Sequence, residues 1–368
     1  MPNGIFIIPK PENEPVLSYA PGAPERMALK AELEQLSTNK IVIPLIIGGK
    51  EVFTETKSNV IMPHKHSHVL AECCQAGEKE LALAIDAAQA ARENWEMTPW
   101  EHRSAVFLKA AELFSVKYRA LIVASTMLCQ SKVAYQAEID SPCELVDFLR
   151  FNVYFADQIY RQQPDSSSGV WNRLSYRPLD GFVLAVSPFN FTAIGANLCT
   201  APAMLGNTLL WKPSSASLLS NYYIMKILME AGLPAGVINF VPASGKVISR
   251  YVIPDPRMSG FHFTGSTDVF GNVWRQVGEN IRSYHSYPRL VGETGGKDFI
   301  FAHKSADIPA LVSAMVGGLL NSRGKSVPHF PEPLSPNPSG LKSKKRSLRL
   351  WPNSKQEMSA ISEILWAQ

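Results

Sequence analysis

The pattern of apolar and polar positions changes near Pro178. Before it, we expect helices and one hairpin, whereas short β-rich runs dominate after it. The expected helices cover residues 23–36, 78–95, 100–117 and 137–162. The last range contains Pro142, so we expect a break there. Residues 41–70 alternate apolar and polar positions around Gly48 and Gly49, which is typical of a hairpin.

Beyond Pro178, β-rich runs alternate with helical stretches five times. The runs are GFVLAVSP, NTLLWKPS, GVINFVPAS, MSGFHFTGS and PRLVGETGGKDFIFAH. Successive strand–helix units predict an α/β fold with a parallel sheet and helices on both faces. Ligands bind such sheets at the carboxyl ends of the strands. The chemistry is therefore expected in the segments SPFNFTA, WKPS, VPASG, FTGST and ETGGK.

Composition narrows the class of protein. The chain has 368 residues, 46% of them hydrophobic, and a formal net charge of +4, which gives no reason to expect a nucleic-acid partner. The five cysteines form an odd set without a C-x-x-C pair, which favours reduced thiols over disulfides or structural zinc. No apolar run approaches the length of a membrane span. The N-terminal segment resembles neither a secretory signal nor a mitochondrial presequence.

Several strand ends carry groups that suit a nucleotide, although no G-x-G-x-x-G fingerprint follows any strand. Lys212 and Ser214 place a cation and a hydroxyl just past a strand, within reach of a ribose or phosphate. Gly265 would permit close approach of a ligand, and Ser266 would cap a helix and face a phosphate. An ordinary helix cap explains the Gly-Ser pair equally well.

Two strand ends carry candidate catalytic groups. Asn190 lies after a buried strand between two phenylalanines, where its amide could donate to a developing oxyanion. Glu293 lies beside two glycines, and partial desolvation there would raise its pKa and suit a general base. A turn asparagine and a surface glutamate are the simpler interpretations. The alternating His64, His66 and His68 indicate a solvent-facing strand edge rather than a metal site.

Taken in order, SPFNFTA, NTLLWKPS, AGLPAGVINFVP, FTGST and GETGGKD resemble the aldehyde dehydrogenase superfamily. Upstream, NEPVLSYAPGAPER, IGGKEV, QAEID and ELVDFLRFN are similar to its L-glutamate gamma-semialdehyde dehydrogenase subfamily. The resemblance covers roughly residues 13–320. It implies a fold with an open NAD-binding sheet and the NAD-dependent oxidation of glutamate semialdehyde to glutamate in proline catabolism.

The resemblance also assigns roles to individual residues. Asn190 becomes the oxyanion amide and Glu293 the general base. The implied cofactor contacts are Lys212 and Ser214 at the adenosine ribose, Gly265 and Ser266 at the pyrophosphate, and Pro188 and Phe189 nearby. Arg150 matches an arginine that pairs with the substrate carboxylate, and Glu138 a carboxylate at the aldehyde end. No metal is implied.

The family's nucleophilic cysteine has no counterpart in this chain. That thiol lies in a motif like EFQGQKCSA, where this chain has NSRGKSVPH and places Val327 in the thiol's position. Read one nucleotide later, codons for EFQGQKCSA can encode NSRGKSVPH. The terminal EMSAISEILWAQ, shifted back by one nucleotide, can yield the family-like DVGDFRDFMGP. We therefore hypothesise a frameshift near residue 320.

These comparisons divide the chain into three parts. Residues 1–70 form an arm and an oligomerisation hairpin, residues 71–320 an NAD-binding domain, and residues 321–368 an aberrant tail whose Pro, Ser and basic content predicts disorder. Most of the catalytic domain is expected to be missing. The family is homo-oligomeric, which this chain need not be. The resemblance implies the mitochondrial matrix, although a cytoplasmic location stays open.

Two functional hypotheses follow. In the first, the gene read in frame encodes a working enzyme. In the second, the chain is an inactive fragment that retains at most NAD binding or association with intact subunits. An unrelated nucleotide-binding module would require the ordered motifs to be coincidental.

Sequencing the transcript across Leu320 tests the frameshift. We expect a displacement of a single nucleotide there, caused by a sequencing error, a missed intron or a lesion. An undisplaced reading that encodes Val327 would contradict the hypothesis.

Overall fold

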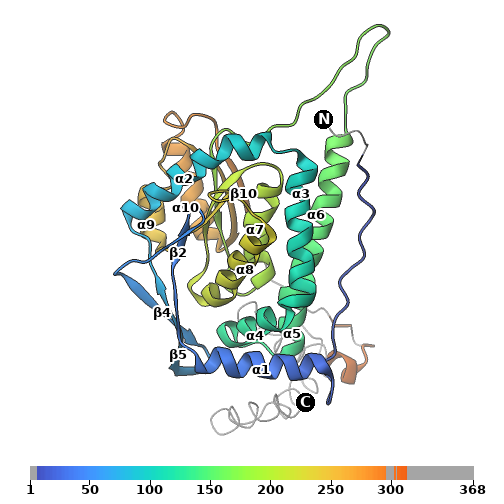
Figure 1. Ribbon diagram of the computed structural model, residues 1–368, viewed down its shortest axis with the longest axis vertical. Helices are drawn as coiled ribbons and strands as arrows, with labels where there is room; N and C mark the ends of the chain where they lie inside the picture. Colours follow the sequence, from blue (N-terminus) through green and yellow to red (C-terminus); the bar gives the residue numbers. More distant parts are fainter. Residues whose placement is uncertain (1–5, 296–301, 304, 313–368) are drawn as a thin grey trace. The chain divides into compact units, whose positions relative to one another are not determined.

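The computed structural model describes residues 6–295, 302–303 and 305–312 (Figure 1). They fall into two compact units, of which the first is Met1–Thr294 and the second begins at Gly295. In the second unit, residues 308–312 are helical, so the last predicted helix begins as expected. The rest of that helix, Val327 and the tail 321–368 lie outside the described residues. The three-part division of the chain stays a prediction.

The first unit is built on a seven-stranded sheet in the order β10-β9-β6-β7-β8-β2-β3. The strands β6 to β10 are the five predicted from the sequence, and they pair in parallel. Their bounds are Phe182–Val186, Thr208–Lys212, Ile238–Phe240, Met258–Gly265 and Arg289–Thr294. The predicted α/β class with an open parallel sheet is therefore confirmed for these strands.

The Gly48–Gly49 hairpin extends this sheet, which is consequently mixed. Strand β2 (Leu45–Ile47) is antiparallel to both β8 and β3 (Lys50–Val52). Both turn glycines have positive φ, as a two-residue hairpin turn requires. Without β2, β8 would expose a row of unpaired backbone groups. The hairpin thus has a pairing partner in its own chain, and its role in oligomerisation stays a prediction.

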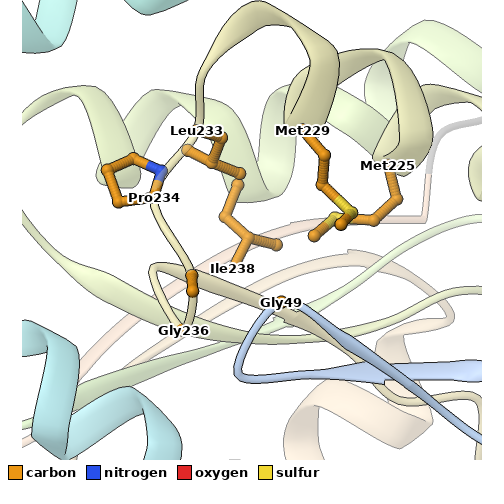
Figure 2. A pocket seen from close by; sticks show the side chains of 8 residues that line it. Gly49, Met225, Met229, Leu233, Pro234, Gly236 and Ile238 are labelled. Atoms are coloured by element: carbon orange, nitrogen blue, oxygen red, sulfur yellow. The ribbon is translucent and has the colours of Figure 1, made fainter.

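A small apolar cavity lies beside this hairpin turn (Figure 2). Its volume is about 150 Å³, and it is lined mainly by Met225, Met229, Leu233 and Ile238 around Gly49. Because β2 runs antiparallel to β8, the cavity lies at the amino end of that strand. It is therefore on the opposite edge of the sheet from the predicted ligand site.

Helices cover both faces of the sheet, as the strand pattern predicts (Figure 1). Alternate residues of β6 enter different cores: Phe182 and Leu184 join one, and Val183 and Ala185 the other. The first core includes α2 (Glu78–Met97), α9 (Gly245–Tyr251) and α10 (Thr267–Glu279). The second includes α7 (Thr192–Met204) and α8 (Leu218–Ala231).

Further helices pack outside α7 and α8. They are α1 (Pro24–Thr38), α3 (Trp100–Glu112), α4 (Arg119–Gln130), α5 (Ala134–Glu138) and α6 (Glu144–Arg161). A π-turn at Leu113–Lys117 ends α3, and a second one, Ile139–Cys143, contains Pro142 where the break is predicted. Helix α4 was not predicted; it is buried on most sides, polar residues such as Thr126 and Gln130 included.

A second, smaller sheet lies beside α1 and α4. Its order is β1-β5-β4, with β1 (Ile41–Ile43) parallel and β4 (Lys57–Met62) antiparallel to β5 (Lys65–Cys74). Both sheets therefore draw strands from residues 41–70. Across the described part of the chain, no helix has both the length and the apolar character needed to cross a membrane.

The N-terminal arm, residues 6–22, runs alongside α6 (Figure 1) and is held by buried charges. The guanidinium of Arg119 lies between the carboxylates of Glu14 and Glu138 and pairs with both. Glu138 also accepts hydrogen bonds from the Leu17 amide (2.9 Å) and the Tyr19 hydroxyl (2.6 Å). The predicted extended arm is thereby fixed to α4 and α5.

Glu14 holds the arm through further polar contacts besides its pair with Arg119. It pairs with Arg150 at 2.7 Å and accepts a hydrogen bond from Ser115, also at 2.7 Å. Burial pushes the pKa of Glu14 up, but the hydrogen bonds from Ser115, Arg119 and Arg150 outweigh it, and the pKa is lowered. We call Glu14, Tyr19, Arg119, Glu138 and Arg150 the arm network.

Replacing Arg119 by methionine tests the arm network. The change leaves Glu138 buried without a cation and Glu14 with Arg150 as its remaining cation, so we expect the free energy of unfolding to fall by about 3–5 kcal/mol. Arg275→Met removes an exposed pair with Glu279 and should cost less than about 1 kcal/mol. Urea denaturation of both variants measures the difference. Equal midpoints would show that the network does not stabilise the fold.

Candidate functional site

The register of the parallel strands places the predicted groups along one edge of the sheet. Val186 pairs with Lys212 on one side and with Phe263 on the other. Glu293 pairs with Thr264, one residue further along. Lys212 and Glu293 are three strands apart, about 14 Å at the usual strand spacing. The edge therefore suits an extended ligand.

The strand order reverses at the middle of this edge. The chain runs from β6 to β7 and β8 in one direction, then returns to place β9 on the other side of β6. Such a reversal opens a crevice between the two neighbouring strands, and ligands bind there in open α/β sheets. The turn that follows β6, residues 187–191, borders this crevice.

Hydrogen bonds of Ser187 to α7 and β7 fix this turn. The Ser187 hydroxyl donates to the Gly195 carbonyl at 3.0 Å and accepts from the Trp211 indole at 2.6 Å. Pro188 is buried, whereas Phe189 is 40% exposed. Asn190 is half-buried, and its side-chain amide has no hydrogen-bond partner among the described residues. An amide presented in this way can donate to a ligand oxygen.

Polar side chains are buried under the start of α7. The Thr192 hydroxyl receives a hydrogen bond from Gln130 (2.7 Å), contacts the Thr126 hydroxyl (2.9 Å) and donates to Ser220 (3.1 Å). The side-chain carbonyl oxygen of Gln130 is buried and has no hydrogen-bond partner among the described residues. These contacts tie the turn to α4 and α8.

Lys212 is a cation with no ion pair or hydrogen bond for its ammonium group in the described part of the chain. Burial lowers the pKa of Lys212. An unpaired buried cation is costly, so its position favours a ligand that supplies oxygen acceptors. Ser214 follows at the start of a 3₁₀ turn, half-buried, with an extended backbone.

The segment after β9 forms the start of α10. Ser266 is the N-cap, and its hydroxyl accepts a hydrogen bond from the Val269 amide at 3.3 Å. Ser266 is therefore an ordinary helix cap, which was the simpler of the two interpretations of the sequence. Packing within the protein is enough to explain a glycine at position 265, because a Cβ there would lie 2.6 Å from the ring of Phe263. The absence of a side chain at Gly265 thus leaves space for the Phe263 ring, whether or not a ligand also approaches there.

The side chain of Glu293 is not partly desolvated, as the sequence had led us to expect. Its side chain is exposed, because β10 is an edge strand and no other described strand covers it. A second carboxylate, Glu144 at the start of α6, is partly buried instead. Burial raises the pKa of Glu144 to about 7, and the nearby Asp140 and Glu293 add to the rise. Glu144 was missed because its position in ELVDFLRFN is typical of an ordinary first-turn acid.

Arg150 and Glu138 do not lie with these groups. Arg150 pairs with Glu14 and Glu112, and both oxygens of Glu138 accept hydrogen bonds within the arm network. The geometry gives no support to their assignment to the substrate, which stays a prediction. The strand spacing could not reveal these contacts, since the partners in the arm lie more than a hundred residues away along the chain.

The histidine cluster is dispersed. The Nδ1 atom of His64 lies 2.7 Å from the Ser131 hydroxyl, His66 is exposed, and His68 is half-buried. Within the described ranges, no three His, Cys, Asp or Glu side chains are grouped as a metal ion requires.

A comparison with protein families decides the class of this site. The sequence model described as "Aldehyde dehydrogenase family" matches residues 52–327. The chain belongs to the aldehyde dehydrogenase family. The resemblance noted in the sequence is thus confirmed, and the turn at Asn190 and the edge at Lys212 belong to an aldehyde dehydrogenase fold.

Curated aldehyde dehydrogenase relatives are nearly half identical to this chain over the aligned residues. It is 47% identical over 321 residues to the mitochondrial delta-1-pyrroline-5-carboxylate dehydrogenase of Dictyostelium discoideum, covering 86% of the chain and 58% of that protein. The corresponding mitochondrial protein of Homo sapiens is 46% identical over 304 residues, covering 83% and 54%. The chain therefore spans little more than half the length of these relatives.

Solved aldehyde dehydrogenase structures agree in fold. The delta-pyrroline-5-carboxylate dehydrogenase of Mycobacterium tuberculosis bound with NAD superposes with a TM-score of 0.87 at 50% identity, covering 88% of this chain and 61% of that one. The 1-pyrroline-5-carboxylate dehydrogenase from Thermus with bound NAD gives 0.81 at 28% identity, covering 88% and 62%.

The raised pKa of Glu144 predicts a pH-dependent stability. Between pH 4.5, its ordinary pKa, and about 7, the folded state retains a proton that the unfolded state releases. Stability therefore falls as pH rises through this window, by on the order of 2 kcal/mol. Glu144→Gln should remove that loss.

Urea denaturation below pH 4.5 and above pH 7 measures the effect. The variant Glu279→Gln, at an exposed carboxylate paired with Arg275, should keep the wild-type pH dependence. If Glu144→Gln also keeps it, Glu144 is not the titrating group.

Proposed function

We propose that this chain is derived from an NAD-dependent aldehyde dehydrogenase that oxidises L-glutamate gamma-semialdehyde, the open form of pyrroline-5-carboxylate, to L-glutamate in proline catabolism. The relatives named delta-1-pyrroline-5-carboxylate dehydrogenase support the substrate. The row of Lys212, Asn190 and Glu293 along one sheet edge carries the proposal, because it joins a nucleotide subsite to groups for carbonyl chemistry.

The residues present fit NAD. The Lys212 ammonium, half-buried and without a partner among the described residues, would bind the ribose hydroxyls together with Ser214. The start of α10 at Ser266 offers backbone amides and a positive dipole end to the pyrophosphate. Pro188 and Phe189 border the crevice beside them. When bound, NAD accepts the hydride that leaves the substrate.

The remaining groups of the site act on the aldehyde end. The free amide of Asn190 would donate to the oxygen as negative charge develops on it. Glu293 would accept a proton from attacking water, and Glu144, with its pKa of about 7, can hold or release a proton beside it. Nothing in this scheme requires Arg150 or Glu138 to leave the arm network.

The cysteines favour the alternative of an inactive NAD-binding chain. The family's chemistry needs a thiolate, and no cysteine occurs after Cys199. All five cysteines are buried. Burial raises the pKa of Cys129 and Cys199, and raises the pKa of Cys73 and Cys143 to about 12. These four thiols are therefore protonated at neutral pH and cannot replace the missing nucleophile.

We further propose self-association and a mitochondrial location. The segment 162–177 projects from the end of α6 (Figure 1) and exposes apolar side chains, including Trp171 at 77%. Its two sides are joined by hydrogen bonds between Gln163 and Leu174, so it can present this surface to a second subunit. The mitochondrial names of the relatives support the location.

Calorimetry with NAD on the full chain tests the proposal. We expect binding without NADH formation when glutamate semialdehyde is added, because the nucleophile is absent. Lys212→Met should weaken binding about tenfold or more, since a hydrogen bond to a charged group contributes about 1.5–3 kcal/mol. Lys226→Met, which removes an exposed pair with Glu51, should leave binding unchanged.

Each outcome decides one part of the proposal. Absence of NAD binding would contradict the nucleotide site. Turnover by this chain would contradict the inactive alternative. Equal affinities of the two lysine variants would contradict the role of Lys212.

A further inference from the structure

The turn that carries Asn190 is held by a lysine from a different part of the fold. The ammonium group of Lys132 donates a hydrogen bond to the backbone carbonyl of Asn190. It also lies 2.6 Å from the carboxylate of Asp140 and 4.3 Å from the centre of the Phe191 ring. The side chain is only 9% exposed, so these contacts replace its hydration.

We propose that Lys132 is a positioning residue, which with Asp140 fixes the Asn190 turn so that the amide points into the crevice. The inference rests on the proposed oxyanion role of Asn190 and names the groups that make it possible. Lys132 has no need to touch the substrate, because it acts through the backbone of Asn190 and the ring of Phe191.

The backbone before Lys132 is itself constrained. Ser131, the C-cap of α4, has φ 55° and ψ 41°, a left-handed conformation that is uncommon for a non-glycine residue. The Ser131 hydroxyl lies 2.7 Å from Nδ1 of His64, in the turn between β4 and β5. This contact fixes the point at which Lys132 leaves α4 and directs its side chain toward the turn.

Asp140 and Glu138 face opposite sides of the same helical segment, because residues two apart in a helix are rotated by about 200°. Glu138, two residues earlier, lies in the arm network with no exposed surface. The π-turn Ile139–Cys143 inserts an extra residue per turn, which rotates the following residues by about 100° relative to a continuous α-helix. Asp140 and Glu144 both face Lys132, while Glu138 faces the arm. A single helical segment serves both sites.

The ammonium group is nearly saturated by these contacts. It donates to one carboxylate and one carbonyl and lies over one aromatic ring, so a neutral side chain of similar length would lose all three. The Asn190 carbonyl would then have no partner among the described residues, and an unpaired half-buried carbonyl favours rearrangement of the turn.

Nuclear magnetic resonance on the full chain labelled with ¹⁵N-asparagine tests this role. The Asn190 signals, assigned with Asn190→Ser, should show a rigid backbone with an order parameter of about 0.85 in the wild type. In Lys132→Met we expect it to fall below about 0.6, with the side-chain amide becoming mobile as well. Asp140→Asn should also lower the backbone order parameter of Asn190 and increase the mobility of its side-chain amide, but to a smaller extent.

Internal and matched controls separate positioning from general stability. Asn239, a buried residue of β8, accepts a hydrogen bond from the Gly48 amide of the hairpin turn, donates to the Gly236 carbonyl at 2.8 Å and should stay rigid in every variant. Lys40→Met, which removes an exposed pair with Glu72, should leave Asn190 rigid. A rigid Asn190 in Lys132→Met would overturn the proposal, as would equal loss of order at Asn190 and Asn239. Because neither NAD nor turnover is needed, failure here is distinct from failure of NAD binding.

Discussion

The burial of the Arg119 guanidinium between Glu14 and Glu138 is the interaction on which the helical half of the structure depends. Two buried carboxylates and a buried cation are each unfavourable alone, so none of the three can leave without a large cost. The arm therefore lies where Glu14 must be, and α5 ends where Glu138 must be. The π-turn that follows starts from this fixed point, which determines where Asp140 and Glu144 face.

The other half of the site follows from the topology of the sheet. Parallel strands joined by crossovers bring their carboxyl ends to one edge, and the reversal between β6 and β9 opens the crevice there. The sheet supplies Lys212 and Glu293, and the helices supply Lys132 and Glu144. The turn at Asn190 contacts both, through Ser187 on one side and Lys132 on the other.

The same division explains how much could be predicted from the sequence. The strands, the edge of the sheet and its candidate groups follow from short β-rich runs and from their alternation with helical stretches, both of which can be recognised along the chain. The ordered motifs at that edge identified the family. Lys132, Asp140 and Glu144 depend on contacts between α4, the π-turn and α7, for which no periodic signal exists. Arg150 and Glu138 matched a motif, yet their partners in the arm lie far away along the chain.

The site also carries local costs that ordinary packing would avoid. Lys212 is half-buried without a counter-charge among the described residues, Glu144 is held partly protonated near neutrality, and Ser131 has a left-handed backbone. Each of these features has a local free-energy cost. A bound dinucleotide would supply the acceptors that Lys212 lacks, and its binding energy adds to the stability of the folded state. The fold that surrounds the crevice therefore tolerates these costs because the arm network and the two cores stabilise it independently.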